Sequence, residues 1–298
     1  MIRLGIASIG ELHAGQRHQD AGSATALLHL RDTIEHLARH QILCYRIPAS
    51  VVRAACAVDQ HVFLATIGAR ARDLGMRLTA HAGMGCALGA ADHESASASV
   101  AGLTQIANVL DALGCGSAGT IVVHLVGSIH DSQVPVRFAR RYAALPAQVQ
   151  QRLAIEPDGA GWSLGDLHVL HVQCGIPIVL DALHLQLNNP QRISVAEALR
   201  IALGSWPTDV RPKVHLSTQR TEAHTRPGRA GQAYRIIAPR RGEHADFLNP
   251  FEAGALLAAA RGARPFDLMI EARAGDLALI RLREDLDRYQ PALAALVG

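Results

Sequence analysis

The sequence predicts an α/β fold, built as a single (β/α)8 TIM barrel over residues 1–298. Short apolar or β-branched runs alternate with alanine- and leucine-rich stretches that carry apolar residues every three or four positions, which is typical of such a barrel. The chain has 298 residues and is 49% hydrophobic, so it can fill one large core. It shows no linker-like change of composition, internal repeat or low-complexity tract, and we therefore expect one domain.

The predicted strands are short and apolar on both faces, as expected for parallel strands covered by helices. The first of them lies near the start of the sequence, and helical patterns lie between them. In chain order they are Arg3–Ser8, Cys44–Pro48, Arg77–Ala82, Thr120–Gly127, Leu153–Pro157, Pro177–His184, Lys213–Gln219 and Asp267–Arg273.

The predicted helices have recognisable start and stop signals. Ser163 and Ser194 stand at N-cap positions, and Pro250 falls in a first turn, where its missing N–H costs nothing. Glycine ends three helices in the left-handed conformation just before a strand, at Gly75, Gly114 and Gly175. The helices are Thr25–His40, His61–Leu74, Ser95–Leu113, Val134–Leu153, Ser163–Cys174, Val195–Leu203, Pro250–Arg261 and Leu277–Arg288.

The composition excludes several classes of protein. The hydrophobic content argues against intrinsic disorder, and no run approaches the roughly 20 apolar residues of a membrane span. The first residues, Met1–Ile6, read as a strand and not as a secretory signal. The cysteines are odd in number and lack a CxxC pair, so we expect reduced thiols in a cytoplasmic protein: Cys44, Cys56, Cys86, Cys115 and Cys174.

Metal-ligating side chains fall at or after the ends of six successive predicted strands. In a barrel those ends meet at one mouth, and a histidine or carboxylate among apolar strand residues is costly to bury unless it is paired or bound to metal. Taken singly, a strand histidine is more often a hydrogen-bonded core residue, and the Asp181-x-x-His184 pair equally suits a helix cap. Taken together they predict a metal site made of His81, His124, Glu156, Asp181, His184, His215, His244 and Glu271.

This donor set is too large for one ion, so two or three divalent ions bridged by carboxylates are expected. Nitrogen and oxygen donors without thiolate suit Mn2+, Zn2+ or Fe2+, and the residues do not choose among them. Such clusters suit phosphodiester hydrolysis, because one ion activates a water while the others neutralise the phosphate and the leaving oxygen.

Lysine occurs once in the chain, at Lys213, against a Lys+Arg total of 29. A general preference for arginine over lysine explains why the surface cations are arginines, but it does not explain why one lysine remains. A buried lysine can lose its proton and become a nucleophile or a carbamate, which a guanidinium cannot do. Lys213 stands two residues before His215, on the same face of its strand, so we expect it to serve the chemistry at the barrel mouth.

These motifs resemble the UV damage endonucleases (UvdE/UvsE-like), TIM barrels related to the apurinic endonucleases. The likeness runs in order from the first strand to the last and covers nearly the whole chain. It rests on His81-x-Gly, Val-Val-His124-Leu, Glu156, Asp181-x-x-His184, Arg-Pro-Lys213-Val-His215-Leu-Ser, His244-x-Asp246 and Glu271-Ala.

The resemblance implies a DNA repair nuclease that hydrolyses a phosphodiester immediately 5′ of an ultraviolet photolesion and so starts excision repair. It implies a site filled by manganese and a carboxylated Lys213 near the metals. It also implies catalytic roles for Lys213, Glu156 and Asp181, with one of the two carboxylates bridging the ions. The expected partner is double-stranded DNA with a lesion, with no membrane and no obligate protein partner.

Some positions depart from the family pattern. A Gln-Tyr pair that wedges into the duplex at the lesion is replaced by Met84 and Gly85. The first strand runs Ile6-Ala-Ser-Ile, without the expected tyrosine and asparagine, and the segment from Arg46 to Val51 lacks a family histidine. We therefore expect intact metal chemistry with altered reading of the lesion, and Met84 at a DNA-contacting position.

The charge pattern is permissive for DNA. The formal net charge is only +3. Between the seventh predicted strand and His244, however, the chain carries a group of arginines, namely Arg220, Arg226, Arg229, Arg235, Arg240 and Arg241. A basic loop beside the metals would suit a DNA phosphate backbone, and it equally suits a solvated surface loop. Arg220 and Arg273 are the expected phosphate contacts. Two alternatives remain: a metal-dependent barrel acting on a small molecule, such as a sugar isomerase, epimerase or oxidative enzyme, and a DNA-binding barrel without turnover.

Overall fold

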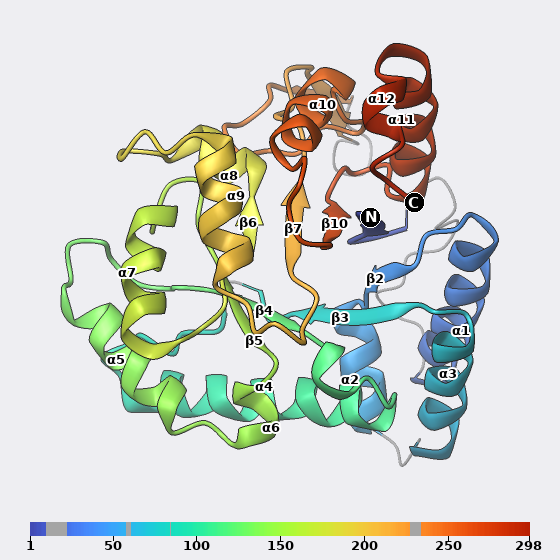
Figure 1. Ribbon diagram of the computed structural model, residues 1–298. Coiled ribbons are helices and arrows are strands. Elements are labelled where there is room, and N and C mark those ends of the chain that lie inside the picture. Colours follow the sequence, from blue (N-terminus) through green and yellow to red (C-terminus); the bar gives the residue numbers. More distant parts are fainter. Residues whose placement is uncertain (10–22, 58–60, 84, 227–233) are drawn as a thin grey trace.

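The computed structural model describes residues 1–9, 23–57, 61–83, 85–226 and 234–298, and these confirm the predicted parallel barrel (Figure 1). Its strands are β1 (Arg3–Ile6), β2 (Cys44–Arg46), β3 (Arg77–His81), β4 (Ile121–His124), β5 (Leu153–Glu156), β6 (Leu180–Asp181), β7 (Lys213–Leu216) and β10 (Asp267–Ile270). They are hydrogen-bonded in the order β5-β4-β3-β2-β1-β10-β7-β6. A parallel bridge between Ile155 and Ile178 joins β5 to the residues that lead into β6 and closes the barrel.

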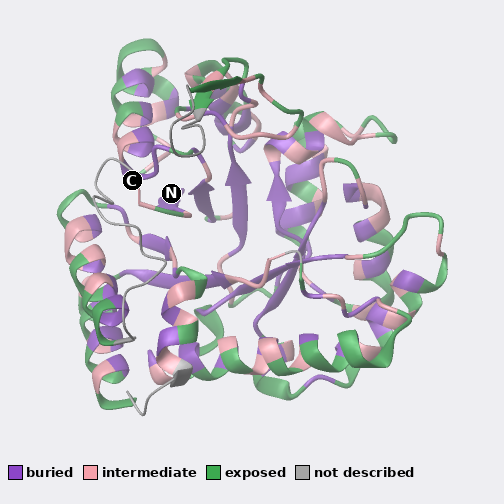
Figure 2. Cartoon of the chain, turned by 180° about the vertical axis from the view of Figure 1, so that it is seen from behind, coloured by how far each residue is buried: buried purple, intermediate pink, exposed green. Residues whose placement is uncertain are grey.

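The helices lie outside the strands, and the outer surface of most of them is exposed while the strands are buried (Figure 2). The N-caps expected at Ser163 and Ser194 are present, with each side chain accepting a backbone N–H of its own first turn. The helices are α1 (Ser23–Arg39), α2 (Ala49–Ala57), α3 (His61–Asp73), α4 (His93–Ala112), α5 (Gln133–Ala143), α6 (Ala147–Gln150), α7 (Leu164–Cys174), α8 (Ala182–Leu187), α9 (Val195–Gly204), α10 (Pro250–Ala259), α11 (Asp276–Tyr289) and α12 (Pro291–Ala294).

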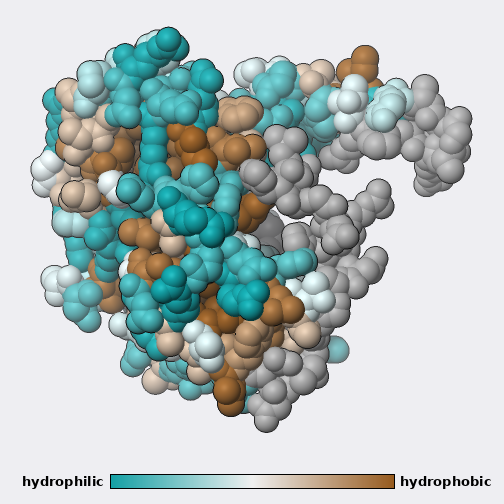
Figure 3. Space-filling model, turned by 90° about the vertical axis from the view of Figure 1, so that its right-hand side faces the viewer, coloured by the Kyte–Doolittle hydropathy of each residue, from teal (hydrophilic) through white to brown (hydrophobic). Residues whose placement is uncertain are grey.

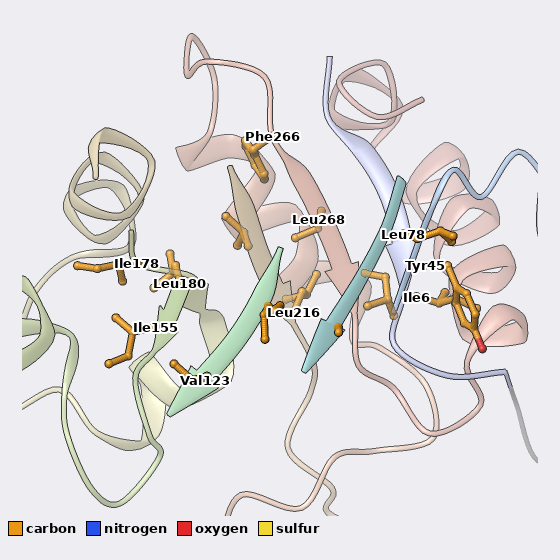
Figure 4. Close-up of a cluster of buried hydrophobic side chains, with 14 of the residues drawn as sticks. Ile6, Tyr45, Leu78, Val123, Ile155, Ile178, Leu180, Leu216, Phe266 and Leu268 are labelled. Carbon is orange, nitrogen blue, oxygen red and sulfur yellow. The ribbon is translucent and has the colours of Figure 1, made fainter. Parts of the chain in front are cut away.

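The hydrophobic core fills the layer between strands and helices. Alternate residues of each strand point outward into it, as Val123, Ile155, Leu216 and Leu268 do in Figure 4. The intervening residues point into the barrel, where Val122, Ala154, Val179 and Trp206 form a small apolar cluster. Polar side chains gather at both ends of the barrel, around Asp267 at the N-terminal ends of the strands and around Glu156 at their C-terminal ends.

The lower polar centre lies at the N-terminal ends of the strands and surrounds Asp267, which has no exposed surface. Asp267 accepts hydrogen bonds from Arg3 at 2.7 and 2.9 Å and from Arg77 at 2.6 Å. The guanidinium of Arg211 lies 3.0 Å from the same carboxylate. Burial would raise the pKa of Asp267, but the hydrogen bond from Arg3 and the charge of Arg77 outweigh it, so the pKa is lowered.

Two predicted elements needed correction, and one helix was missed. The stretch Val134–Leu153 is two helices, α5 and α6, because Pro146 takes an extended conformation between them. The strand Pro177–His184 ends at Asp181, where α8 begins, so His184 lies on a helix and not on a strand. Helix α2 was not predicted: the predicted strand Cys44–Pro48 ended at Pro48, and no helix was assigned to the residues directly after it.

The segment between β7 and α10 contains a hairpin that was expected only as a basic loop. Its strands β8 (His224–Arg226) and β9 (Arg235–Ile237) pair antiparallel. Tyr234 and Ile236 expose 72% and 78% of their surface on it.

No helix among the described residues is both long and apolar enough to cross a membrane. On the face drawn in Figure 3, hydrophilic and hydrophobic residues are interspersed.

Candidate metal centre

The upper polar centre lies at the C-terminal ends of the barrel strands. Parallel pairing sets His124 level with Glu156, and Asp181 level with His215. Because these are inward-pointing positions on neighbouring strands, their side chains converge on the barrel axis. Two groups of side chains have ligand atoms within 4.8 Å of one another: His81, His124 and Glu156 form one, and Glu156, Asp181, His215 and Glu271 form the other.

Glu156 belongs to both groups and is only 2% exposed. Its Oε1 lies 2.9 Å from Nδ1 of His215, and its Oε2 lies 3.3 Å from Nε2 of His81. Nε2 of His124 is 3.6 Å from the same Oε2. One carboxylate therefore faces both groups, one oxygen toward each.

Two more predicted residues lie beside the groups. Nδ1 of His184 is 3.7 Å from Oε1 of Glu156 and 3.9 Å from Oδ1 of Asp181. His244 donates from Nδ1 to the backbone carbonyl of Glu271 over 2.7 Å. The structure thus brings together all eight predicted donors at one mouth of the barrel, six of them in the two groups.

Several ring orientations are fixed by the backbone. His184 donates Nδ1–H to the carbonyl of Pro157 over 2.9 Å, and His124 donates to the carbonyl of Glu156 over 3.2 Å. With His244 bonded in the same way, three rings keep a lone pair on Nε2. Such second hydrogen bonds are characteristic of histidines that ligate metals.

The donor set fits divalent cations. Oδ2 of Asp181 and Nε2 of His215 are buried and have no hydrogen-bond partner among the described residues. Leaving two such atoms unpaired is costly, and a bound cation would satisfy both. Because the donors are imidazoles and carboxylates without a thiolate, they suit Mn2+, Fe2+ or Zn2+.

Burial and neighbouring charges shift the pKa values of the carboxylates in the cluster. Burial would raise the pKa of Glu156, but the charge and hydrogen bond of His215 hold it well below its usual range. Burial raises the pKa of Asp181 to about 6, and the neighbouring Glu156 and Glu271 add to the effect. Asp181 also caps α8, since its Oδ1 accepts the backbone N–H of His184 over 2.7 Å. Both interpretations of this residue, helix cap and cluster member, are therefore correct.

Replacing Asp181 by asparagine is expected to stabilise the metal-free protein near neutral pH while weakening metal binding. Asparagine is an equally good cap, so α8 keeps its start. Because the pKa of about 6 exceeds the value of about 3.9 for unfolded aspartate, the buried charge destabilises the fold above pH 6 by about 3 kcal/mol. Wild-type stability should rise as the pH falls from about 7 toward about 4. The rise should be smaller in Asp181→Asn, where His184 and His215, whose pKa values are also raised in the fold, still contribute to it.

Urea unfolding of chelator-treated protein across this pH range, with metal analysis of the untreated protein, measures both effects. Asp73→Asn, a change on the exposed surface of α3, is the control. A variant that is less stable than wild type at neutral pH would contradict the expectation.

Lys213 lies below the cluster, 1% exposed, and donates from Nζ to Oγ1 of Thr79 over 2.5 Å. Burial lowers its pKa to about 8. A substantial fraction of the amine is therefore neutral near physiological pH.

The residues that were expected to contact DNA differ in how exposed they are. Arg220 is 3% exposed and its guanidinium pairs with Asp246, so burial removes it from the surface that DNA could reach. We correct that expectation: Arg220 fixes the segment that carries His244. Arg273 keeps 38% of its side chain exposed at the mouth, and Met84 lies outside the described residues. Among the other arginines, Arg235, Arg240 and Arg241 are exposed, Arg229 is outside the described residues, and only the backbone of Arg226 is described.

One residue of the site was missed. Arg46, the last residue of β2, donates from Nη1 to Oε1 of Glu271. A single arginine at a strand end carries no spacing signal in a chain this rich in arginine, so only the fold reveals it.

Comparison with known proteins places the chain in a family. The model of the family described as UV-endonuclease UvdE matches residues 7–295. The chain belongs to the UvdE family. A UvdE-family relative, the UV DNA damage endonuclease of Bacillus cereus (strain G9842), is 25% identical over 274 residues, which covers 86% of this chain and 81% of that protein.

Solved structures share the UvdE barrel. The crystal structure of SacUVDE matches with a TM-score of 0.78 at 22% identity, covering 97% of this chain and 99% of that one. Endonuclease IV from Thermus thermophilus matches with a TM-score of 0.61 at 18% identity, covering 96% and 99%. At these identities the likeness concerns the fold, so the site of this UvdE-family member is argued from its own residues.

Proposed function

We propose that the protein is a UV damage endonuclease, which hydrolyses a DNA phosphodiester 5′ to a photolesion. The observation that carries this proposal is the double group of imidazoles and carboxylates around Glu156, at the open mouth of the barrel in a chain of the UvdE family. Family membership favours this function over the small-molecule alternative. Retention of the complete donor set argues against a barrel that has lost turnover.

The site would hold two or three divalent ions, with manganese as the first choice. His81 and His124 would hold one ion and Asp181, His215 and Glu271 another, and Glu156, which belongs to both groups, could serve either ion. When bound, these ions supply an activated water at neutral pH and neutralise charge on the scissile phosphate and the leaving oxygen. His184 and His244 lie beside Glu156 and Glu271, where they are placed to complete the coordination.

The chain's own residues orient and protect this chemistry. The carbonyls of Glu156, Pro157 and Glu271 hold three histidine rings in position, so little reorganisation is required at the moment of reaction. Arg273 remains as a contact for the backbone of double-stranded DNA. We place the enzyme in the cytoplasm and assign the whole chain to one catalytic domain.

Lys213 is expected to be carboxylated. In this step the neutral Nζ attacks carbon dioxide, a nitrogen–carbon bond forms and one proton leaves, giving an anionic carbamate. Its pKa of about 8 and its burial favour the neutral amine that the step requires. After incubation with 13C-bicarbonate, we expect a carbamate carbon signal in NMR spectra of wild type and none in Lys213→Arg. Unchanged activity and metal content in Lys213→Arg would defeat the assignment.

Strand nicking tests the function directly. Protein loaded with manganese is incubated with plasmid that is irradiated, depurinated or untreated. We expect selective nicking of the irradiated plasmid, abolished by EDTA and restored by manganese. If none of the three substrates is nicked, the proposal is wrong and the small-molecule alternative gains.

A further inference from the structure

Arg46 introduces a permanent positive charge at the edge of the metal centre. It ends β2, which lies between β1 and β3 in the barrel (Figure 1), and it pairs in register with Thr79. Its guanidinium reaches Oε1 of Glu271, an oxygen that lies 3.5 Å from Nδ1 of His215. The guanidinium therefore touches the second ligand group directly.

Most of the hydrogen-bonding capacity of Arg46 is unused. A guanidinium has five N–H donors in a planar fork, and Glu271 is its sole hydrogen-bond partner among the described residues. Its side chain is 25% exposed, so it is not sealed inside the barrel. This differs from Arg77, whose donors bond Ala118, Arg211, Asp267 and Thr120 inside the barrel. Arg77 thus has the full set of partners expected of a structural arginine. Arg46 has one partner, Glu271, and the other N–H groups of its guanidinium have none among the described residues.

Arg46 lines an open hollow beside the cluster, together with His81 of the first ligand group. This hollow has a volume of about 380 Å³ and is lined by Ala7, Arg46, Ile47, Pro48, Ala49 and His81. As far as the described residues line it, the hollow has no carboxylate, and Arg46 is the only permanently charged residue there. An anionic group placed over His81 would therefore meet one fixed cation.

We propose that Arg46 is a phosphate-binding residue of the active site, contacting a non-bridging oxygen of the DNA backbone while Glu271 anchors it. The inference rests on the proposed function, since it takes DNA as the ligand. A guanidinium suits this role because it stays charged at every working pH and can donate two parallel hydrogen bonds to a phosphate. It would complement the metal ions as negative charge builds up on the phosphate.

Salt dependence of DNA binding separates this role from a merely structural one. Each phosphate contact contributes about 0.9 to the slope of log affinity against log salt concentration on duplex DNA. We expect Arg46→Gln to reduce this slope by about 0.9 with an irradiated duplex in EDTA, where no cleavage occurs. Arg46→Lys should retain the slope. Arg261→Gln, exposed just after α10 where the chain leads toward the start of β10, lies at the end of the barrel away from the mouth and should leave the slope unchanged.

Activity provides the second readout. Loss of a preorganised donor to the reacting group costs about 100- to 1,000-fold in turnover, so Arg46→Gln should lose that much nicking and Arg46→Lys markedly less. Metal content and melting temperature should stay at wild-type values. An unchanged slope in Arg46→Gln, or a loss of metal without a change of slope, would overturn the proposal and leave Arg46 as a counter-ion of Glu271.

The two proposals fail in different ways. If wild type nicks no irradiated plasmid but binds the duplex with a slope that falls in Arg46→Gln, the endonuclease assignment is wrong and the phosphate contact stands. If wild type does not bind the duplex, the phosphate contact is overturned. If Arg46→Gln does not fold, Arg46→Lys provides the test instead. A slope of log affinity against log salt concentration below the wild-type value in Arg46→Lys would contradict the phosphate contact.

Discussion

Glu156→Gln is expected to abolish nicking, with a loss of about 1,000-fold or more. Among the described residues, Glu156 is the one carboxylate that belongs to both ligand groups, and its two oxygens face different histidines. An amide keeps the shape but loses the charge, so both ion sites lose the anion they share. Charge stabilisation of several kcal/mol by metal ions corresponds to a loss of this size.

Nicking rates and metal content by mass spectrometry check this result together. Glu284→Gln, on the exposed surface of α11, is the matched control and should behave as wild type. A Glu156→Gln protein that keeps its full metal content and more than a tenth of its activity would contradict the central role given to this residue.

Asp267→Asn is expected to destabilise the protein by about 3–5 kcal/mol without altering the metal content. The substitution leaves Arg3, Arg77 and Arg211 around a neutral, buried side chain. Removing one partner of a buried ion pair leaves uncompensated charge, which accounts for the size of the effect. Because total stabilities are about 5–15 kcal/mol, this is a large fraction of the whole.

The pH dependence of the Asp267→Asn effect has a definite sign. The pKa of Asp267 is lowered in the fold, so its carboxylate stabilises the protein above the unfolded pKa of about 3.9, and this stabilisation is lost as the pH falls through the folded value. The difference between wild type and variant should therefore narrow below about pH 4. Urea unfolding at several pH values measures it, with exposed Asp287→Asn as the control. Equal stabilities at neutral pH would show that the arginines do not depend on this carboxylate.

The barrel and most of its site could be predicted because both depend on local sequence patterns. Eight apolar runs, each followed by a helical pattern, specify the strands, and the donors follow from their positions at strand ends. His184 could not be placed correctly, because a strand end and a helix start read alike at Asp181-Ala-Leu-His. Its donor still reaches the site, since the cap at Asp181 starts α8 directly at the mouth.

The features that were missed depend on contacts between distant segments. Arg220 was expected to contact a DNA phosphate from a basic loop, and only the fold brings Asp246 against its guanidinium. Arg46 and Glu271 lie far apart in the chain, on β2 and just after β10, and meet only when the barrel closes. No spacing rule within one segment reports such a pair.

Closure between β5 and β6 is slight: the backbone bonds there run from Ile155 N–H to Pro177 and from Val179 N–H to Ile155, each 2.8 Å long. Glu156 follows one side of this seam and Asp181 the other, and both belong to the second ligand group. A cation bound by both carboxylates would link β5 and β6 where only a single backbone bridge joins them. Metal binding should then slow amide deuterium uptake at Ile155 and Val179 more than at other backbone amides. Loading the site would in this way also stabilise the closure of the barrel.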